Sequence, residues 1–357
     1  MRQPRLHALE RRVTRAIGAL PLWLQHQMRD SGHVAALLNS LTLAATALIG
    51  NIRLLRSRRA ARLEIAYGPL PAHRLDIYGE VASRHPTAPA IVFIHGGGWT
   101  LGSKLLYGLV GDSLACHGAV CSVVGYRLFP EAAIPEQVDD VRLALQSLHE
   151  RFPKRPLVLV GHSSGAHVAA LTMACAAASG EPLPIRGFCG ISGVYDVASH
   201  FEHERQRGLH QISPMQPAAG NCAGSYSAMS PMRVISDELS PSNVIRLPVV
   251  LLIHGTEDWT VPFSSSVDFA HALHAAGAVG VHCELLEGKG HMDFVGGCIA
   301  GHQDIVCEWL QPLQRWLDEC VGQKTPQLGW PRKQSMPEFE HTALGLGEQQ
   351  ASPAARL

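Results

Sequence analysis

The sequence predicts an α/β fold built on a mainly parallel sheet, with helices on both faces and an inserted cap. Short continuous apolar runs, such as AIVFI at Ala90–Ile94, are typical of strands buried on both faces. Helical stretches separate these runs, and alternating strands and helices favour parallel pairing. Residues 193–247 break the alternation with scattered Pro, Gly and Met. A loop of that size is rare unless it is functional, so we expect a cap over the site.

The strands follow one another along residues 63–286. Two short segments open the series, and Gly68-Pro69 marks the turn between them. Apolar runs then recur after each helical stretch. The expected strands are Leu63–Ala66, Arg74–Tyr78, Ala90–Ile94, Ala119–Gly125, Leu157–Val160, Ile185–Ile191, Val249–Ile253 and His282–Leu286. The expected helices are Leu105–His117, Gln137–Glu150, Gly165–Ala178, Ser264–Ala276 and His302–Leu317.

The two ends differ in character from this body, which we place at 63–321. Residues 1–62 hold eleven arginines, no lysine and two acidic residues, so this segment is strongly basic although the whole chain is neutral. Val34 to Ile52 carries no charge and arginines follow it, as in a membrane anchor with the next domain on the cytosolic side. An organelle-targeting segment or a buried helix are the alternatives. Residues 322–357 are rich in Pro, Gly and Gln and are expected to be a disordered tail.

No cofactor or metal is indicated. The nine cysteines include no CxxC pair and no zinc-type spacing. The Gly-rich segment after the strand at Ala90–Ile94 lacks the GK[ST] ending of a phosphate-binding loop. No nucleic-acid motif accompanies the basic N-terminal residues, so a nucleic-acid partner is not expected.

The strongest chemical signal is Gly161-His162-Ser163-Ser164-Gly165. It follows a buried strand and opens an Ala-rich helix, and in that context a GxSxG sequence projects a nucleophilic serine above the sheet. We therefore expect Ser163 to be the nucleophile.

A second signal, His95-Gly96-Gly97-Gly98-Trp99, comes directly after another buried strand. Glycines allow backbone N–H groups to turn toward a substrate oxygen and stabilise the oxyanion that forms on attack. Gly97, Gly98 and the N–H of Ser164 are the expected oxyanion donors. His95, Gly96 and Trp99 are expected to support them.

A serine nucleophile needs a base, and the base needs an acid that orients it. The order Ser, acid, His is typical of enzymes whose nucleophile lies on a strand-to-helix turn. Asp258 follows the strand Val249–Ile253, and His291 lies in a Gly-flanked loop after the next strand. We assign Asp258 as the acid and His291 as the base; Glu257 and Asp293 are the competing acids.

These motifs, together with Tyr126-Arg127-Leu128-Phe129-Pro130-Glu131, HGTEDWTVP and GKGH, resemble the carboxylesterase and hormone-sensitive-lipase-like members of the α/β-hydrolase superfamily. Within that group the chain is most similar to the isoprenylcysteine methylesterases, with kynurenine formamidase as a near relative. The cap segments Ser192–Asp196 and Ile212–Met215 also resemble those of the methylesterases, whereas Gly220–Met232 has no counterpart.

The resemblance implies a serine esterase that works through an acyl-enzyme, with a small-molecule or lipidated ester as substrate and a membrane-associated location, for example the endoplasmic reticulum. A cytoplasmic location, an arylformamidase, a general carboxylesterase or lipase, and a non-enzymatic hydrolase-fold binding protein are the alternatives. For a prenylated substrate, apolar cap residues are expected to line the pocket, with Trp99 at its rim. These are Val194, Tyr195, Phe201, Leu209, Ile212 and Met215.

Overall fold

The computed structural model describes residues 62–79, 88–115, 119–300, 303–322 and 325. Within them the chain forms one eight-stranded sheet in the order β1-β2-β4-β3-β5-β6-β7-β8. β1 and β2 pair antiparallel, β2 and β4 also pair antiparallel, and every other pair is parallel. The strands are β1 (Arg62–Ala66), β2 (Arg74–Tyr78), β3 (Ala90–Ile94), β4 (Val120–Val124), β5 (Leu157–His162), β6 (Gly187–Ile191), β7 (Val249–Gly255) and β8 (Val281–Leu286).

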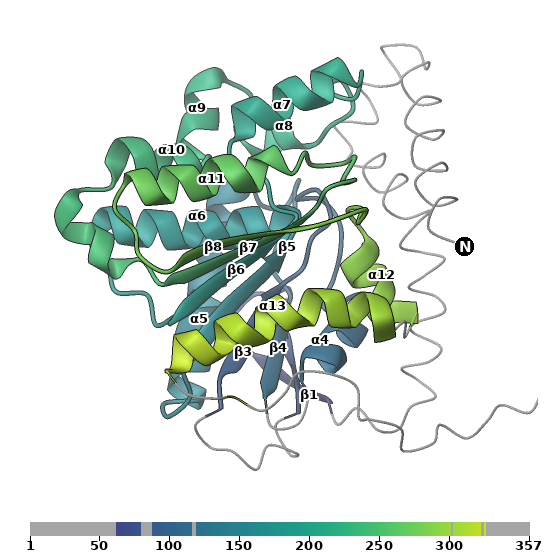
Figure 1. Ribbon diagram of the computed structural model, residues 1–357, viewed down its shortest axis with the longest axis vertical. Coiled ribbons are helices and arrows are strands. Elements are labelled where there is room, and N and C mark those ends of the chain that lie inside the picture. Colours follow the sequence, from purple (N-terminus) through teal and green to yellow (C-terminus); the bar gives the residue numbers. More distant parts are fainter. Residues whose placement is uncertain (1–61, 80–87, 116–118, 301–302, 323–324, 326–357) are drawn as a thin grey trace, which may run out of the picture.

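The predicted fold class is confirmed, because helices cover both faces of this sheet (Figure 1). Within β3, Val92 and Ile94 point to one core cluster while Ile91 and Phe93 point to the other. This alternation is the two-residue period of a strand buried on both sides. One cluster includes the inner faces of α5 (Ile134–Arg151), α6 (Ser164–Ser179) and α11 (Ser264–Ala275). The other includes those of α4 (Gly108–Leu114), α12 (Asp293–Ala300) and α13 (Gln303–Val321).

All eight predicted strands and all five predicted helices of the body are present, with ends that shift by a few residues. One helix of the body, α12, was not predicted; it begins two residues after His291. Its adjacent glycines at 296 and 297 favour a loop in isolation. Phe294 and Val295 are fully buried, and Phe294 packs on Trp309 of α13. Tertiary packing therefore forms a helix that local propensity does not predict.

The predicted cap, residues 193–247, contains short helical segments and no strand. It begins with the longest of them, α7 (Val197–Gln206), and ends with a 3₁₀ turn before β7. Figure 1 shows α7, α8 and α9 grouped beyond one end of the sheet. The other segments are α8 (Met215–Ala218), α9 (Ala223–Ala228), α10 (Pro231–Arg233), the π-type turn η1 (Val234–Glu238) and the 3₁₀ turn η2 (Pro241–Arg246).

Several predictions fall outside the described residues. The basic N-terminal segment up to residue 61, including the uncharged Val34–Ile52 run, lies outside them, as does almost all of the predicted tail from 322 to 357. Among the helices that the structure describes, none is both long and apolar enough to cross a membrane.

Candidate active site

Ser163 lies between the end of β5 and the first residue of α6, at the sharp turn that the GxSxG sequence predicts. Its φ of 55° and ψ of −126° are unusual for a residue with a side chain and cost about 1–3 kcal/mol. The turn is fixed by hydrogen bonds on both sides. The Ser163 N–H donates to the carbonyl oxygen of Ile191 on β6, and the Ser163 carbonyl accepts from the N–H of His167. The neighbouring strand and the helix thus hold the hydroxyl above the sheet.

The structure brings His291 and Asp258 to this hydroxyl, although they are 128 and 95 positions away in the sequence. His291 Nε2 lies 2.9 Å from Ser163 Oγ, and His291 Nδ1 lies 2.8 Å from Asp258 Oδ2. A carboxylate can only accept, so Nδ1 carries the proton and Nε2 accepts from the Ser163 hydroxyl. This is the tautomer that a general base requires.

Asp258 is buried, and each of its carboxylate oxygens faces two hydrogen-bond donors. Oδ1 accepts from the N–H groups of Thr260 and Val261, both at 2.9 Å. Oδ2 accepts from His291 and also lies 3.2 Å from Nε2 of His254. Burial alone would raise the pKa of Asp258, but the positive charge that His291 carries when it is protonated, together with hydrogen bonds from the two histidines, outweighs burial and lowers it. The side chain therefore remains a carboxylate at neutral pH.

His254 is a residue whose role the sequence analysis missed. It is fully buried at the end of β7, and its Nε2 faces both Asp258 and the carbonyl oxygen of Val261 at 3.1 Å. Nε2 therefore carries a proton that it shares between two acceptors. Nδ1 lies 2.7 Å from Ser266 Oγ on α11, which fixes the ring. The only signal in the sequence is its position in HGTEDWTVP, four residues before Asp258.

The two competing acids lie elsewhere. Glu257 has an exposed side chain, and its N–H donates to the carbonyl oxygen of Lys289. Asp293 is buried at the start of α12, where Oδ2 accepts from the N–H of Gly290 at 2.8 Å. Asp293 therefore braces the loop that carries His291, whereas Asp258 contacts the His291 ring.

The Gly-rich loop after β3 lies directly against the nucleophile. A Cβ on Gly96 would lie 2.9 Å from Ser163 Cβ and 2.7 Å from the carbonyl oxygen of His162. Gly97 has a φ of 140°, and a Cβ there would lie 2.2 Å from the carbonyl oxygen of Leu101. Only glycine fits this path. Gly96 thus lies against Ser163, and the role of the following Gly97 and Gly98, with Ser164, as oxyanion donors stays a prediction.

His95 and His162 support this loop from below. His95 is buried between Tyr107 and Tyr126, with ring centroids 5.6 and 4.6 Å away, which fits its predicted supporting place. His162, whose role was missed, has Nε2 3.0 Å from the carbonyl oxygen of His291. Burial lowers the pKa of His95 to about 4 and, with the charge of His291, that of His162 to about 3. Both rings are therefore neutral parts of the framework.

Four of the residues expected at the substrate pocket lie in the core instead. Trp99 is only 4% exposed, so it lies in the core and not at a rim. Tyr195 is fully buried and stacks on Phe269 of α11 at 4.4 Å. Val194 and Met215 belong to the same core cluster. These side chains therefore pack into the core that the cap shares with α11.

The cap contacts the segment that follows Asp258. In α7, His203 Nε2 lies 3.4 Å from the carbonyl oxygen of Trp259. Arg207, the residue after α7, lies over the Trp259 ring at 5.2 Å. Arg207 also donates to the carbonyl oxygen of Thr260 at 3.3 Å. The cap thus contacts the same loop that carries Asp258.

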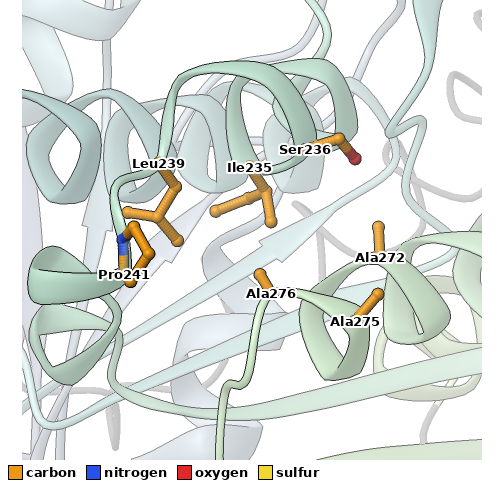
Figure 2. Close-up of a pocket in the computed structure, with 7 residues that line it drawn as sticks. All are labelled: Ile235, Ser236, Leu239, Pro241, Ala272, Ala275 and Ala276. Carbon is orange, nitrogen blue, oxygen red and sulfur yellow. The ribbon is translucent and has the colours of Figure 1, made fainter.

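A pocket of about 290 Å³ lies apart from this constellation, between η1 and the end of α11 (Figure 2). None of the predicted site residues lines it, so we do not connect it with the chemistry. Its lining residues are Ile235, Ser236, Leu239, Pro241, Ala272, Ala275 and Ala276. Among the described residues no group of three or more His, Cys, Asp or Glu side chains could hold a metal ion.

Comparison with known families agrees with this geometry. Residues 91–295, more than half of the chain, match the sequence pattern described as the alpha/beta hydrolase fold. The chain belongs to the α/β-hydrolase family. This stretch of the α/β hydrolase includes the Gly-rich loop, Ser163, Asp258 and His291, and it reaches from β3 into α12.

Several named proteins are similar in sequence to this α/β hydrolase, and they include a methylesterase and a formamidase. A probable isoprenylcysteine alpha-carbonyl methylesterase of Oryza sativa subsp. japonica is 32% identical over 266 residues, covering 71% of this chain and 63% of the relative. The chain thus spans less than two thirds of that protein. A kynurenine formamidase of Danio rerio is 32% identical over 144 residues, covering 40% of this chain and 49% of the relative.

Among solved structures, esterase B from Lactobacillus Rhamnosis (HN001) superposes on this α/β hydrolase with a TM-score of 0.63 and 19% identity. The superposition covers 81% of this chain and 96% of the esterase B chain. At that level of identity the match supports the fold alone.

Proposed function

We propose that this α/β hydrolase cleaves a carboxylic ester through an acyl-enzyme. The observation that carries the proposal is the continuous relay from Asp258 through His291 to Ser163, with contacts of 2.8 and 2.9 Å. Ser163 Oγ attacks the ester carbonyl carbon while its proton passes to His291 Nε2. The alcohol then leaves with that proton, and water repeats the sequence in reverse to release the acid. The N–H groups of Gly97, Gly98 and Ser164 stabilise the oxyanion in both steps.

We further propose that the substrate is a prenylcysteine methyl ester. The support is the similarity to a protein named as an isoprenylcysteine alpha-carbonyl methylesterase. Such a substrate places a long apolar thioether on the acyl side, while only methanol leaves. The apolar chain has to be held by the cap, where Leu209 and Ile212 are buried and Phe201 is half-buried.

This substrate predicts strong discrimination by apolar length. Each buried CH₂ contributes about 0.8 kcal/mol, or about fourfold in kcat/KM. We expect farnesylcysteine methyl ester to exceed unprenylated cysteine methyl ester by about a hundredfold or more in kcat/KM. The measurement compares both with p-nitrophenyl acetate and N-formylkynurenine. Equal values for the two methyl esters would contradict the prenyl substrate and leave the esterase proposal intact.

The second candidate is an arylformamidase, which the similarity to kynurenine formamidase favours. A formamide needs the same relay but no long apolar pocket. A clear preference for N-formylkynurenine over the three esters would establish this alternative, and a preference for p-nitrophenyl acetate would favour a general carboxylesterase. A hydrolase-fold binding protein would turn over none of the four and would not react with a fluorophosphonate.

We also propose that residues 1–62 attach the enzyme to a membrane, with the hydrolase on the cytosolic side and the endoplasmic reticulum as the first candidate location. The support is in the sequence alone: an uncharged run at Val34–Ile52 that arginines follow. An anchor would also bring the enzyme to lipidated substrates, which reside in membranes.

We expect the full chain to sediment with membranes, and a chain shortened to begin at Leu63 to be soluble and active. Sedimentation that resists salt and carbonate would indicate a spanning segment. Release by salt would indicate a surface-bound helix, because screening weakens only electrostatic attachment. A full chain that stays in the supernatant would contradict the anchor and favour the targeting or buried-helix alternative.

A further inference from the structure

Trp99 has an unusual backbone next to the predicted oxyanion donors. It follows Gly98 directly, and its φ of 63° lies in the left-handed region. A large side chain persists there only when its surroundings fix it. Its carbonyl oxygen accepts from Gln137 Nε2 at 3.0 Å and from the N–H of Phe129 at 2.9 Å. These two hydrogen bonds hold the Trp99–Thr100 peptide, so the backbone that leaves the predicted oxyanion donors depends on the anchors of this one residue.

The side chain of Trp99 is anchored by His167, on the first turn of α6. The Trp99 indole Nε1–H donates to His167 Nδ1 at 3.1 Å, with the two rings edge to face. Because an indole nitrogen can only donate, Nδ1 accepts and the imidazole proton is on Nε2. His167 is fully buried, and burial lowers its pKa to about 4, so the ring is neutral in the working range of an esterase.

The other nitrogen of His167 holds the cap. Its Nε2–H donates to the carbonyl oxygen of Met229, which directly follows α9, at a distance of 2.7 Å. The next residue, Ser230, is fully buried and fastens this turn: Oγ accepts from the N–H of Val197 at 2.8 Å and donates to the carbonyl of Tyr226 at 2.6 Å. One imidazole is thus the shared partner of the oxyanion loop and of the cap.

We propose that His167 is a positioning residue that couples the seating of the cap to the alignment of the oxyanion donors. The inference rests on the proposed ester hydrolysis. When the Met229–Ser230 turn is seated, Nε2 has its acceptor and Nδ1 faces Trp99, so the Gly97–Gly98 segment is held in place. When the turn moves, the ring is released and Trp99 loses an anchor. An acyl group that packs under the cap therefore raises kcat, and not only affinity, since it aligns the donors that act in the transition state.

A double-mutant cycle on p-nitrophenyl acetate tests this coupling. Trp99→Phe keeps an aromatic ring and removes the indole N–H, and His167→Phe removes both imidazole contacts. We expect each to lower kcat about tenfold to a hundredfold, less than the loss of a whole oxyanion donor, with KM changed less than about threefold. The double variant should be no slower than the slower single variant, because the two share one interaction. Losses that multiply, or a rise in KM at unchanged kcat, would overturn the proposal.

Milder variants guard against a folding defect. His167→Gln retains one acceptor and one donor on a longer side chain and should recover part of the kcat lost in His167→Phe. Ser230→Ala, in the cap and far along the chain from Ser163, should lower kcat several-fold if the cap positions the loop. His274→Phe, an exposed histidine of α11, is the matched control and should leave kcat unchanged. An unchanged kcat in Ser230→Ala would overturn the coupling.

A second measurement does not depend on turnover. The indole N–H resonance of Trp99 in the full chain is assigned by its loss in Trp99→Phe. It should shift in both His167→Gln and Ser230→Ala. If wild type neither hydrolyses esters nor reacts with a fluorophosphonate, the proposed function fails, yet this resonance still decides the coupling. An unchanged chemical shift of the Trp99 indole N–H in Ser230→Ala would overturn the inference, while the proposed esterase activity would still stand.

Discussion

Replacing Ser163 by alanine is expected to lower kcat for ester hydrolysis about 10⁶-fold and to abolish labelling by a fluorophosphonate. The variant removes the hydroxyl oxygen that lies 2.9 Å from His291 Nε2. The fold should persist, because the backbone hydrogen bonds from Ser163 to Ile191 and from His167 to Ser163 do not involve the hydroxyl. Steady-state kinetics, labelling and a thermal melt on the same preparation check the result.

The neighbouring serine provides the matched control for that variant. Ser164→Ala keeps the backbone N–H that we assign to the oxyanion and removes a buried hydroxyl that has no hydrogen-bond partner. It should retain most of the activity and all of the labelling. Retention of more than a few per cent of kcat in Ser163→Ala, beside a large loss in Ser164→Ala, would contradict the assignment of the nucleophile.

Asp258→Asn is expected to lower kcat about 10⁴-fold. Each carboxylate oxygen of Asp258 faces two N–H donors. The asparagine side chain has one oxygen and one NH₂ group, so in either orientation its NH₂ group faces N–H donors. With NH₂ toward the histidines, His291 is driven to the tautomer that places its proton on Nε2, where it cannot accept from Ser163. With NH₂ toward the main chain, the turn at Thr260–Val261 is destabilised. We therefore also expect a lower melting temperature.

Glu257→Gln separates this explanation from a general loss of local charge. Glu257 is adjacent to Asp258 in the sequence, carries the same charge and is exposed. The kcat of the Glu257→Gln enzyme should therefore differ from that of the wild type by less than twofold. The pH profile of kcat in each variant, measured on p-nitrophenyl acetate, completes the comparison. A swap of the two outcomes would identify Glu257 as the acid in solution.

The relay could be predicted because each of its members follows a strand. Buried strands show in the sequence as apolar runs, and parallel strands bring their carboxyl ends to one edge of the sheet. Ser163, Asp258 and His291 come after β5, β7 and β8, so their order and strand ends suffice to place them together. The choice between Asp258 and Glu257 was weaker, since neighbouring residues share that position, and it depended on which side chain turns inward.

The buried histidines could not be predicted in the same way. His167, His254 and His162 act through contacts with main-chain groups or side chains from other segments: Met229, Asp258 and His291. Nothing in a local pattern distinguishes such a ring from a surface histidine among the twenty in the chain. The expected place of Trp99 failed for a similar reason. A large aromatic residue after a Gly-rich loop suggests a place at the rim of the pocket. Only its packing against His167 shows that the side chain is internal.

The sheet, five helices of the body and the three residues of the relay follow from the sequence, because strand burial and strand-to-helix turns leave local signatures. Tertiary structure alone decided α12, the helical form of the cap and the contacts that join the cap to the oxyanion loop. The physical reason is the range of the interactions. Periodicity and turn chemistry act over a few residues, whereas the Trp99–His167–Met229 link joins atoms that are 68 and 62 positions apart and exists only once the chain has packed.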